Sequence, residues 1–236
     1  MLTIHEHILP RSAARPMIKL RKFSGVTIHE TANTSSTATA ASHDTYMHVN
    51  GGKNSEVSYH YVVDDKEAYH FIPDDEVAWH AGDGGAGKGN CETIAIEICV
   101  NKGGDFKKAV QNAAELSAII LHRHNIRNVV DGTQDRNNGN LFQHNTFSSF
   151  HKNCPMIIRD NGLWSNSLQD VTNHLNMLYG VPDNNVSQCV PPFRVRLTAN
   201  DVETQIGAFS VFGNAVAFAQ RNIGYSVFDA LGKKLY

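Results

Sequence analysis

The hydrophobic residues of the chain follow two periods, which predict two kinds of element. Runs in which β-branched and aromatic residues alternate with polar ones predict strands. These runs cover residues 26–30, 57–63, 67–72 and 93–100. The second and third strands flank Asp64-Asp65 and are expected to form a hairpin. Spacing near 3.6 residues predicts amphipathic helices. These are expected at 106–124, at 163–179 before Gly180, and more weakly at 37–49 before Asn50-Gly51-Gly52.

Polar stretches separate these elements and indicate the domain organisation. Residues 131–153 are rich in Asn, Gly, Asp, Gln and Ser, so we expect a long loop there, and loops of that length are usually functional. Residues 181–192 are polar and rich in proline, which is typical of a linker. We therefore expect an N-terminal catalytic domain at 1–180 and a small C-terminal module at 193–236.

The C-terminal module has its own pattern of short elements. Strands are expected at 194–197, 205–209 and 225–228, and a helix at 214–221. So short a segment cannot bury a large core alone, and dimerisation would help it to bury apolar area. Such an α/β module on a tether suits binding better than catalysis.

Composition removes several classes of partner. The chain has 236 residues, 41% of them hydrophobic, with 21 basic and 23 acidic side chains. The chain therefore has no excess of positive charge that would favour binding to nucleic acid or to an anionic membrane. No segment reaches the length of a membrane span, and residues 1–15 lack the apolar core of a signal peptide. We therefore expect a soluble protein, made in the cytoplasm, whose four cysteines are reduced.

Candidate chemistry gathers at one histidine, one cysteine-containing loop and one carboxylate. His29 stands at the exit of its strand, and His144 and Cys154 stand in the long polar segment. Imidazole and thiolate suit zinc, and three such ligands leave a position for water. For a single histidine, a structural role is the alternative. Glu97 interrupts the most apolar strand, so it is either an ion-paired residue at a strand end or a group at a functional cleft.

An ordered series of sequence blocks resembles one enzyme family. The blocks are VTIHETAN at 26–33, SYHYVVDD at 58–65, AWHAGD at 78–83, IAIEIC at 94–99, and His144 followed by KNCP at 152–155. Over residues 15–180 the chain resembles the zinc-dependent N-acetylmuramoyl-L-alanine amidases of the peptidoglycan-recognition type, and phage endolysins among them. The resemblance implies an α/β fold with a mixed sheet flanked by helices. It also implies hydrolysis of the amide between N-acetylmuramic acid and L-alanine.

The resemblance also assigns roles to residues of this chain. It implies zinc bound by His29, His144 and Cys154. It further implies Glu97, Lys152 and Tyr59 as catalytic residues, and Trp79 and His80 as residues of the substrate groove. The spacing from His144 to Cys154 is longer than is usual in the family, which makes His151 a competing ligand. We favour His144, because an insertion can bulge as a loop while the segment ending at Pro155 stays in register.

Partners and alternatives follow from the same resemblance. The expected partner is bacterial peptidoglycan, with a secondary wall polymer as a candidate ligand of residues 193–236, which faintly resemble small wall-binding modules. An endolysin without a signal peptide would reach the wall only after its release. The alternatives are a bacterial autolysin of the same chemistry, a non-catalytic peptidoglycan-recognition protein, and a regulatory protein that binds a partner enzyme.

Overall fold

The computed structural model describes residues 2–49, 51–148, 150, 152–180, 193–198, 201, 203–209, 212–228 and 234–236. These residues form two compact units, Met1–Thr172 and Asn173–Tyr236. The first contains a six-stranded mixed sheet with helices, and the second a three-stranded sheet with one helix, which confirms the expected fold class. The linker expected at 181–192 lies outside the described residues, and the domain boundary at 180 stays a prediction.

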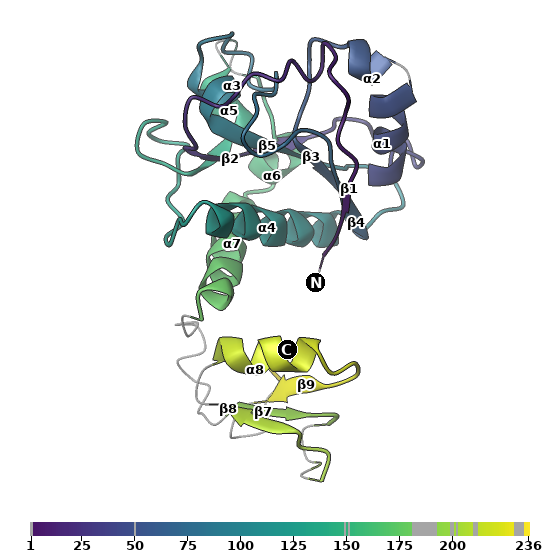
Figure 1. Ribbon diagram of the computed structural model, residues 1–236, viewed down its shortest axis with the longest axis vertical. Helices are drawn as coiled ribbons and strands as arrows, with labels where there is room; N and C mark the ends of the chain where they lie inside the picture. Colours follow the sequence, from purple (N-terminus) through teal and green to yellow (C-terminus); the bar gives the residue numbers. More distant parts are fainter. Residues whose placement is uncertain are drawn as a thin grey trace. The chain divides into compact units, whose positions relative to one another are not determined.

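The large sheet has the strand order β1-β4-β3-β5-β2-β6 (Figure 1). Its strands are β1 (Thr3–Glu6), β2 (Gly25–Glu30), β3 (Tyr61–Val63), β4 (Glu67–His70), β5 (Thr93–Ile98) and β6 (Leu141–Gln143). Strands β2, β3, β5 and β6 are parallel, whereas β4 pairs with β3 in the antiparallel direction and carries β1 beside it. The carboxyl ends of the four parallel strands therefore meet at one edge of the sheet.

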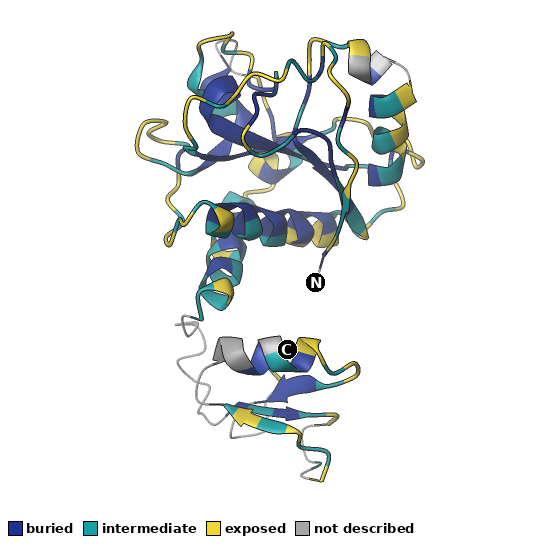
Figure 2. Ribbon diagram, in the orientation of Figure 1, coloured by how far each residue is buried: buried dark blue, intermediate teal, exposed yellow. Residues whose placement is uncertain are grey.

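Helices cover both faces of this sheet, and its centre is buried (Figure 2). Helix α4 (Phe106–Arg123) packs on one face, where its apolar stripe contacts β2, β3 and β5. The side chain of Asp105 caps α4 by accepting the Lys108 N–H. Helix α1 (Ala40–Val49) packs on the other face, where Met47 joins a cluster with Val62 and Phe71. The two faces of the sheet thus have separate cores, and α4 contributes to only one of these cores.

The predicted elements that rest on a long periodic pattern are confirmed. Strands β2 and β5, the β3–β4 hairpin, helix α4 and helix α7 (Trp164–Leu178) all lie where the pattern puts them, although β3 begins at Tyr61 rather than at residue 57. Other expectations were wrong. The loop expected at 131–153 contains β6 and helix α5 (His144–Phe147). Helix α2 (Gly51–Asn54) begins inside the predicted helix stop. A further short helix, α3 (Lys88–Glu92), directly precedes β5.

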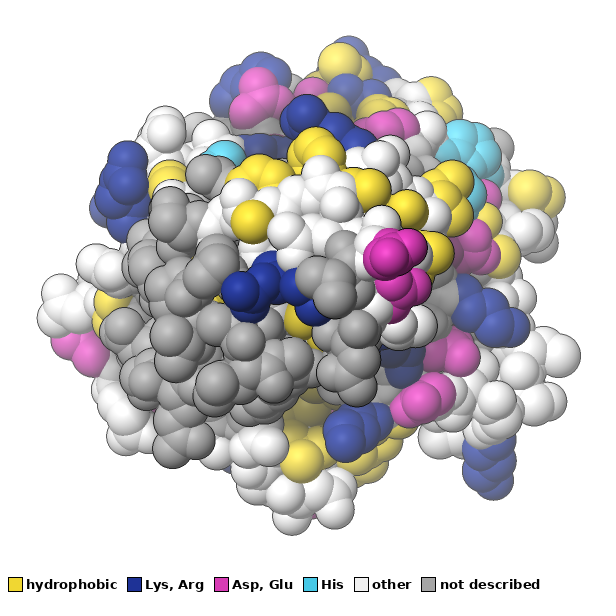
Figure 3. Space-filling model, turned by 90° about the horizontal axis from the view of Figure 1, so that it is seen from below, with side chains coloured by type: hydrophobic (Ala, Val, Ile, Leu, Met, Phe, Trp, Pro, Cys, Tyr) yellow, Lys and Arg dark blue, Asp and Glu magenta, His cyan; other side chains and the backbone are white. Residues whose placement is uncertain are grey.

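The C-terminal unit has the order β8-β7-β9, with every pair antiparallel. Its elements are β7 (Phe193–Arg196), β8 (Gly207–Phe209), α8 (Phe212–Gln220) and β9 (Ser226–Phe228), as the pattern predicts. A small core forms around Val195, Val216 and Val227. On the face seen in Figure 3, basic and acidic side chains are interspersed rather than gathered by sign. Among the described residues, no helix combines the length and apolar content that crossing a bilayer requires.

A fully buried histidine connects three segments of the N-terminal unit. The Nδ1 atom of His60 accepts the Ala95 N–H at 3.0 Å, and its Nε2 atom donates to the Glu76 carbonyl at 2.9 Å. These two bonds fix one neutral tautomer. Burial lowers the pKa of His60 to about 4, so the imidazole stays neutral in the folded protein at neutral pH.

We expect His60 to make folding stability depend on pH. The unfolded chain binds a proton at this residue near pH 6.5, whereas the folded protein binds it only near pH 4. The contribution of His60 to the free energy of unfolding is therefore complete above about pH 6.5 and is lost as the pH falls towards 4, by about 3 kcal/mol in total. The variant His60→Gln does not titrate and should lack this component. Denaturant unfolding between pH 4 and 7 measures it, and parallel pH profiles for the two proteins would contradict the prediction.

Candidate functional site

Three predicted ligand residues converge at the carboxyl edge of the sheet. His29 lies near the end of β2, and His144 follows β6 directly. The Nδ1 atoms of His29 and His144 are 3.0 Å apart, and Cys154 Sγ lies 4.0 Å from the His29 Nδ1 atom. All three donor atoms lie within 4.8 Å of one another, and all three residues are buried. The structure thus brings together residues separated by more than a hundred positions in the sequence. The competing candidate His151 lies outside the described residues.

The cysteine-bearing segment is held from two sides. The Glu30 carboxylate accepts the N–H groups of Ile157 and Ile158 at 2.8 and 2.9 Å, at the start of helix α6 (Met156–Asp160). Asn145 donates its backbone N–H to the Cys154 carbonyl, and its side-chain amide to the Lys152 carbonyl. Sequence reasoning missed both supporting residues. For Glu30 the strand alternation was a usable signal, because it places the side chain on the face opposite His29.

The protonation states of the three residues suit a soft divalent cation. Burial lowers the pKa of His29 well below its ordinary value and that of His144 to about 4, so both rings are neutral near pH 7. Burial also raises the pKa of the Cys154 thiol to about 12. A bound cation would reverse this last effect, because the thiolate is the form that ligates metals. Two imidazole nitrogens and one sulfur, close together and shielded from water, fit the donor set that zinc prefers.

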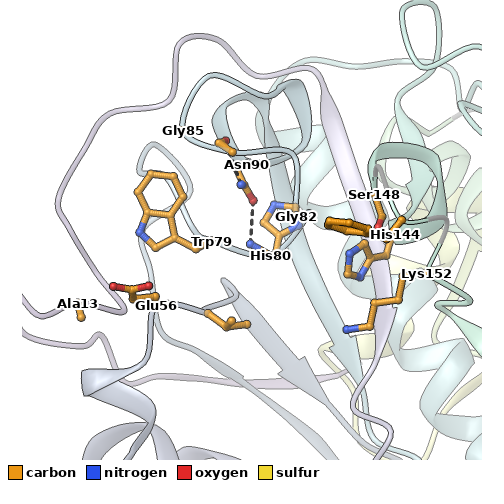
Figure 4. A pocket seen from close by; sticks show the side chains of 13 residues that line it. Ala13, Glu56, Trp79, His80, Gly82, Gly85, Asn90, His144, Ser148 and Lys152 are labelled. Atoms are coloured by element: carbon orange, nitrogen blue, oxygen red, sulfur yellow. Dashed lines mark hydrogen bonds between the residues drawn. The ribbon is translucent and has the colours of Figure 1, made fainter.

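A third imidazole contacts this group. The Nε2 atom of His29 lies 3.0 Å from the His80 Nδ1 atom. Asn90 holds the loop that carries His80, since its Oδ1 atom accepts the backbone N–H groups of His80 and Ala81 at 2.8 and 2.7 Å (Figure 4). Such an outer contact fixes the orientation and tautomer of a ligating ring. His80, which was predicted to contact the substrate, thus also contacts His29.

Glu97 lies directly opposite His29 in the sheet. The two residues are register partners in the parallel β2–β5 pair, and Glu97 Oε1 is 3.8 Å from His29 Nδ1. The other carboxylate oxygen, Oε2, is buried and has no hydrogen-bond partner among the described residues. Burial raises the pKa of Glu97 to about 7, although the charge of Lys152 opposes the shift. No Lys or Arg in the described chain pairs with Glu97, which favours a functional cleft over an ion pair at a strand end.

Two cavities flank the three-residue group. The larger, of about 880 Å³, is lined by Trp79, His80, His144 and Lys152 among others. Figure 4 shows Trp79 on one side of it and His144 and Lys152 on the other. The smaller, of about 340 Å³, is lined by Tyr59 and Glu97 together with residues of α1. Every residue predicted for catalysis or substrate binding therefore lines one of these two cavities.

Known proteins share this arrangement of sequence and fold. The Amidase_2 family model, described as N-acetylmuramoyl-L-alanine amidase, matches residues 19–157. Among curated relatives, N-acetylmuramoyl-L-alanine amidase XlyA of Bacillus subtilis (strain 168) is 41% identical over 101 residues. That alignment covers 43% of this chain and 33% of XlyA, so the match spans about a third of the length of the relative.

Two solved structures are similar over most of the chain. The catalytic domain of XlyA superimposes with a TM-score of 0.60 and 34% identity, and the match covers 72% of this chain and 99% of that domain. A mutant endolysin from Bacillus subtilis matches with the same TM-score, identity and coverage. The family model covers well over half of the sequence. The chain therefore belongs to the N-acetylmuramoyl-L-alanine amidase family, Amidase_2.

Proposed function

We propose that this chain hydrolyses the amide bond between N-acetylmuramic acid and L-alanine in peptidoglycan, with zinc bound by His29, His144 and Cys154. One observation carries the proposal. Three buried donor atoms face one another beside the Glu97 carboxylate, whose Oε2 atom has no hydrogen-bond partner among the described residues, in a chain of the amidase family. The similarity to an endolysin catalytic domain supports a lytic role in the cell wall, which the chain would reach after release from the producing cell.

Amide hydrolysis near neutral pH requires a strong nucleophile, a polarised carbonyl and a proton for the leaving nitrogen. When bound, zinc would supply the first two by lowering the pKa of a water molecule and by acting as a Lewis acid. The third requirement falls to the protein. Glu97 suits it, because Oε2 is free of hydrogen bonds to the described residues and a raised pKa favours both accepting and returning a proton.

Lys152 and Tyr59 have complementary tasks in this proposal. Lys152 lines the larger cavity beside His144, and its positive charge would stabilise the oxygen that becomes negative as the carbonyl is attacked. Tyr59 lines the smaller cavity with Glu97 and would assist there as a neutral hydroxyl donor, since burial raises its pKa well above the ordinary value. Lys152 and Tyr59 would thus act from different cavities.

In this proposal the larger cavity is the substrate-binding site. Trp79 and His80 line it, and aromatic faces are well suited to pack against sugar rings and peptide methyl groups. Its volume of about 880 Å³ beside His144 supports binding of a glycopeptide rather than of a small metabolite. We propose peptidoglycan as the partner on these grounds.

For residues 193–236 we propose a wall-binding role, with a secondary wall polymer as the ligand and self-association as a further property. The C-terminal unit has a separate core around Val195 and Val216, which supports its description as an independent module. Co-sedimentation with purified walls should be weaker for a chain that ends at residue 180 than for the full chain. Equal sedimentation would contradict the wall-binding role.

Product analysis tests the proposed reaction. Digestion of purified cell walls should release peptides with new amino-terminal alanine, because the broken bond is the one to the alanine nitrogen. New reducing sugar ends should not appear. Labelling of free amino groups and a reducing-sugar assay on the same digest measure the two products. Reducing ends would indicate a glycosidase, and binding without any release would indicate a recognition protein.

The identity of the third ligand gives a direct prediction for metal content. The variant His144→Ala removes one of the three converging donor atoms, so the zinc retained after dialysis should fall by about one equivalent relative to the wild type. The variant His151→Ala should retain its zinc. Elemental analysis of both proteins, with circular dichroism to show that each is folded, decides between the two histidines. The reverse pattern would assign the ligand to His151.

Replacement of the carboxylate separates binding from catalysis. The variant Glu97→Gln keeps the shape of the side chain but cannot transfer a proton, so kcat should fall by about 10²- to 10⁴-fold while zinc content is unchanged. Glu67→Gln is the matched control, because Glu67 is a partly exposed carboxylate that contacts a histidine and is in the lining of neither cavity. Dye release from labelled walls measures both rates. Undiminished activity in Glu97→Gln would remove Glu97 from the mechanism.

A further inference from the structure

A second group of metal-binding side chains lies away from the candidate site. Asp44 and His48 are four residues apart on α1, which places them on the same side of the helix. His7 comes from the segment that follows β1. Its Nδ1 atom lies 2.8 and 3.1 Å from the two oxygens of Asp44, and the Nδ1 atom of His48 lies 3.2 Å from Asp44 Oδ1. One donor atom from each of His7, Asp44 and His48 lies within 4.8 Å of the other two.

We propose that His7, Asp44 and His48 form a second binding site for a divalent transition metal ion of the zinc class. Two imidazole nitrogens and a carboxylate oxygen are ligands that such ions accept. The side chains of Asp44 and His48 are only 15% and 16% exposed, so α1 presents two of the ligands in a fixed position. The His7 side chain is 53% exposed, which leaves room for water to complete the coordination.

The surroundings of His48 support this assignment. Its Nε2 atom is buried without a hydrogen-bond partner among the described residues, and its Nδ1 atom faces Asp44, 3.0 Å from the backbone carbonyl oxygen and 3.2 Å from Oδ1. An ion bound to Nδ1 would replace the hydrogen bond to this carbonyl. The edge of the ring contacts Phe71, which limits its rotation. His7 stacks on His48 with ring centroids 3.5 Å apart. Coordination of one ion in the plane of both rings requires His7 to turn out of this stack, which its exposed position allows.

A nearby histidine in β1, His5, forms an ordinary contact with a single carboxylate. His5 lies two residues before His7, is also partly exposed, and contacts the Glu67 carboxylate at 2.7 Å. Its ring stacks on Tyr69 rather than on a second imidazole. Among the described residues, His5 therefore has one carboxylate partner and belongs to no group of three metal-binding side chains, so it provides a matched control for surface histidine binding.

An ion at this site would join the N-terminal segment to α1. Other residues of α1, namely Ser42, His43 and Tyr46, line the smaller cavity beside Glu97. The ion would thus stabilise the helix that forms one wall of the smaller cavity, without contacting Glu97. The expected consequence is greater thermal stability, because a ligand that binds only the folded state shifts the unfolding equilibrium.

Metal titration of the full chain after removal of bound metal tests the proposal. The wild-type protein should bind two equivalents of Zn²⁺, and occupation of the second should raise Tm. His7→Ala and Asp44→Asn should bind the second equivalent at least about tenfold more weakly and lose the rise in Tm. Asp44→Asn keeps an oxygen that can accept from His7 but removes the charge. His5→Ala should behave like the wild type.

Nitrogen-15 NMR of the histidine side chains provides a second readout. The Nδ1 resonances of His7 and His48 should shift on addition of the second equivalent, while those of His5 should not. Uptake of a single equivalent by the wild type would overturn the proposal. Equal losses in His5→Ala and His7→Ala would also overturn it, because they would indicate adventitious binding by surface histidines. Since His144→Ala affects the first equivalent and His7→Ala the second, failure of one site is distinguishable from failure of the other.

Discussion

Parallel pairing between β2 and β5 sets His29 opposite Glu97, and the rest of the candidate centre is built around that register. The same alternation turns Glu30 to the other face, where it holds the start of α6 and with it the cysteine-bearing segment. A slip of one residue would exchange the two faces and bury His29 against α4. The buried isoleucines that fix the pairing, Ile28 and Ile96, therefore also determine the chemistry at the edge.

The centre gathers several polar groups in a place largely shielded from water. Removing such groups from water costs free energy unless they are neutral, hydrogen-bonded or bound to a metal. The imidazoles of His29 and His144 satisfy this condition by staying neutral, and His80 engages the second nitrogen of His29. Glu97 is one exception, since its Oε2 atom has no hydrogen-bond partner in the described chain, and the Nε2 atom of His80 is another. Such an unsatisfied group, next to three convergent donors, is what distinguishes this edge from an ordinary polar core.

Periodic sequence patterns predicted the long elements, and local patterns could not predict the short ones. Strand β5 and helix α4 carry enough residues for their period to be visible, whereas β6 has only three residues within a polar stretch. Strand β6 exists because β2 offers it a free edge, which is a tertiary effect. The candidate metal-binding residues His29, His144 and Cys154 were predictable from residue type and from family resemblance. The contact between His29 and His80 was not, because it depends on a loop that Asn90 holds in place.

The two hydrogen-bonded contacts of Asn145 close the loop between His144 and Cys154 at its base. The exposed part of the loop near Phe150 is therefore where a change of length or composition would least disturb the His144 and Cys154 side chains at its two ends. The rim of the larger cavity, where Phe150 is 87% exposed, is part of that stretch. We expect changes there to alter the lining of the larger cavity while the group of His29, His144 and Cys154 stays in place.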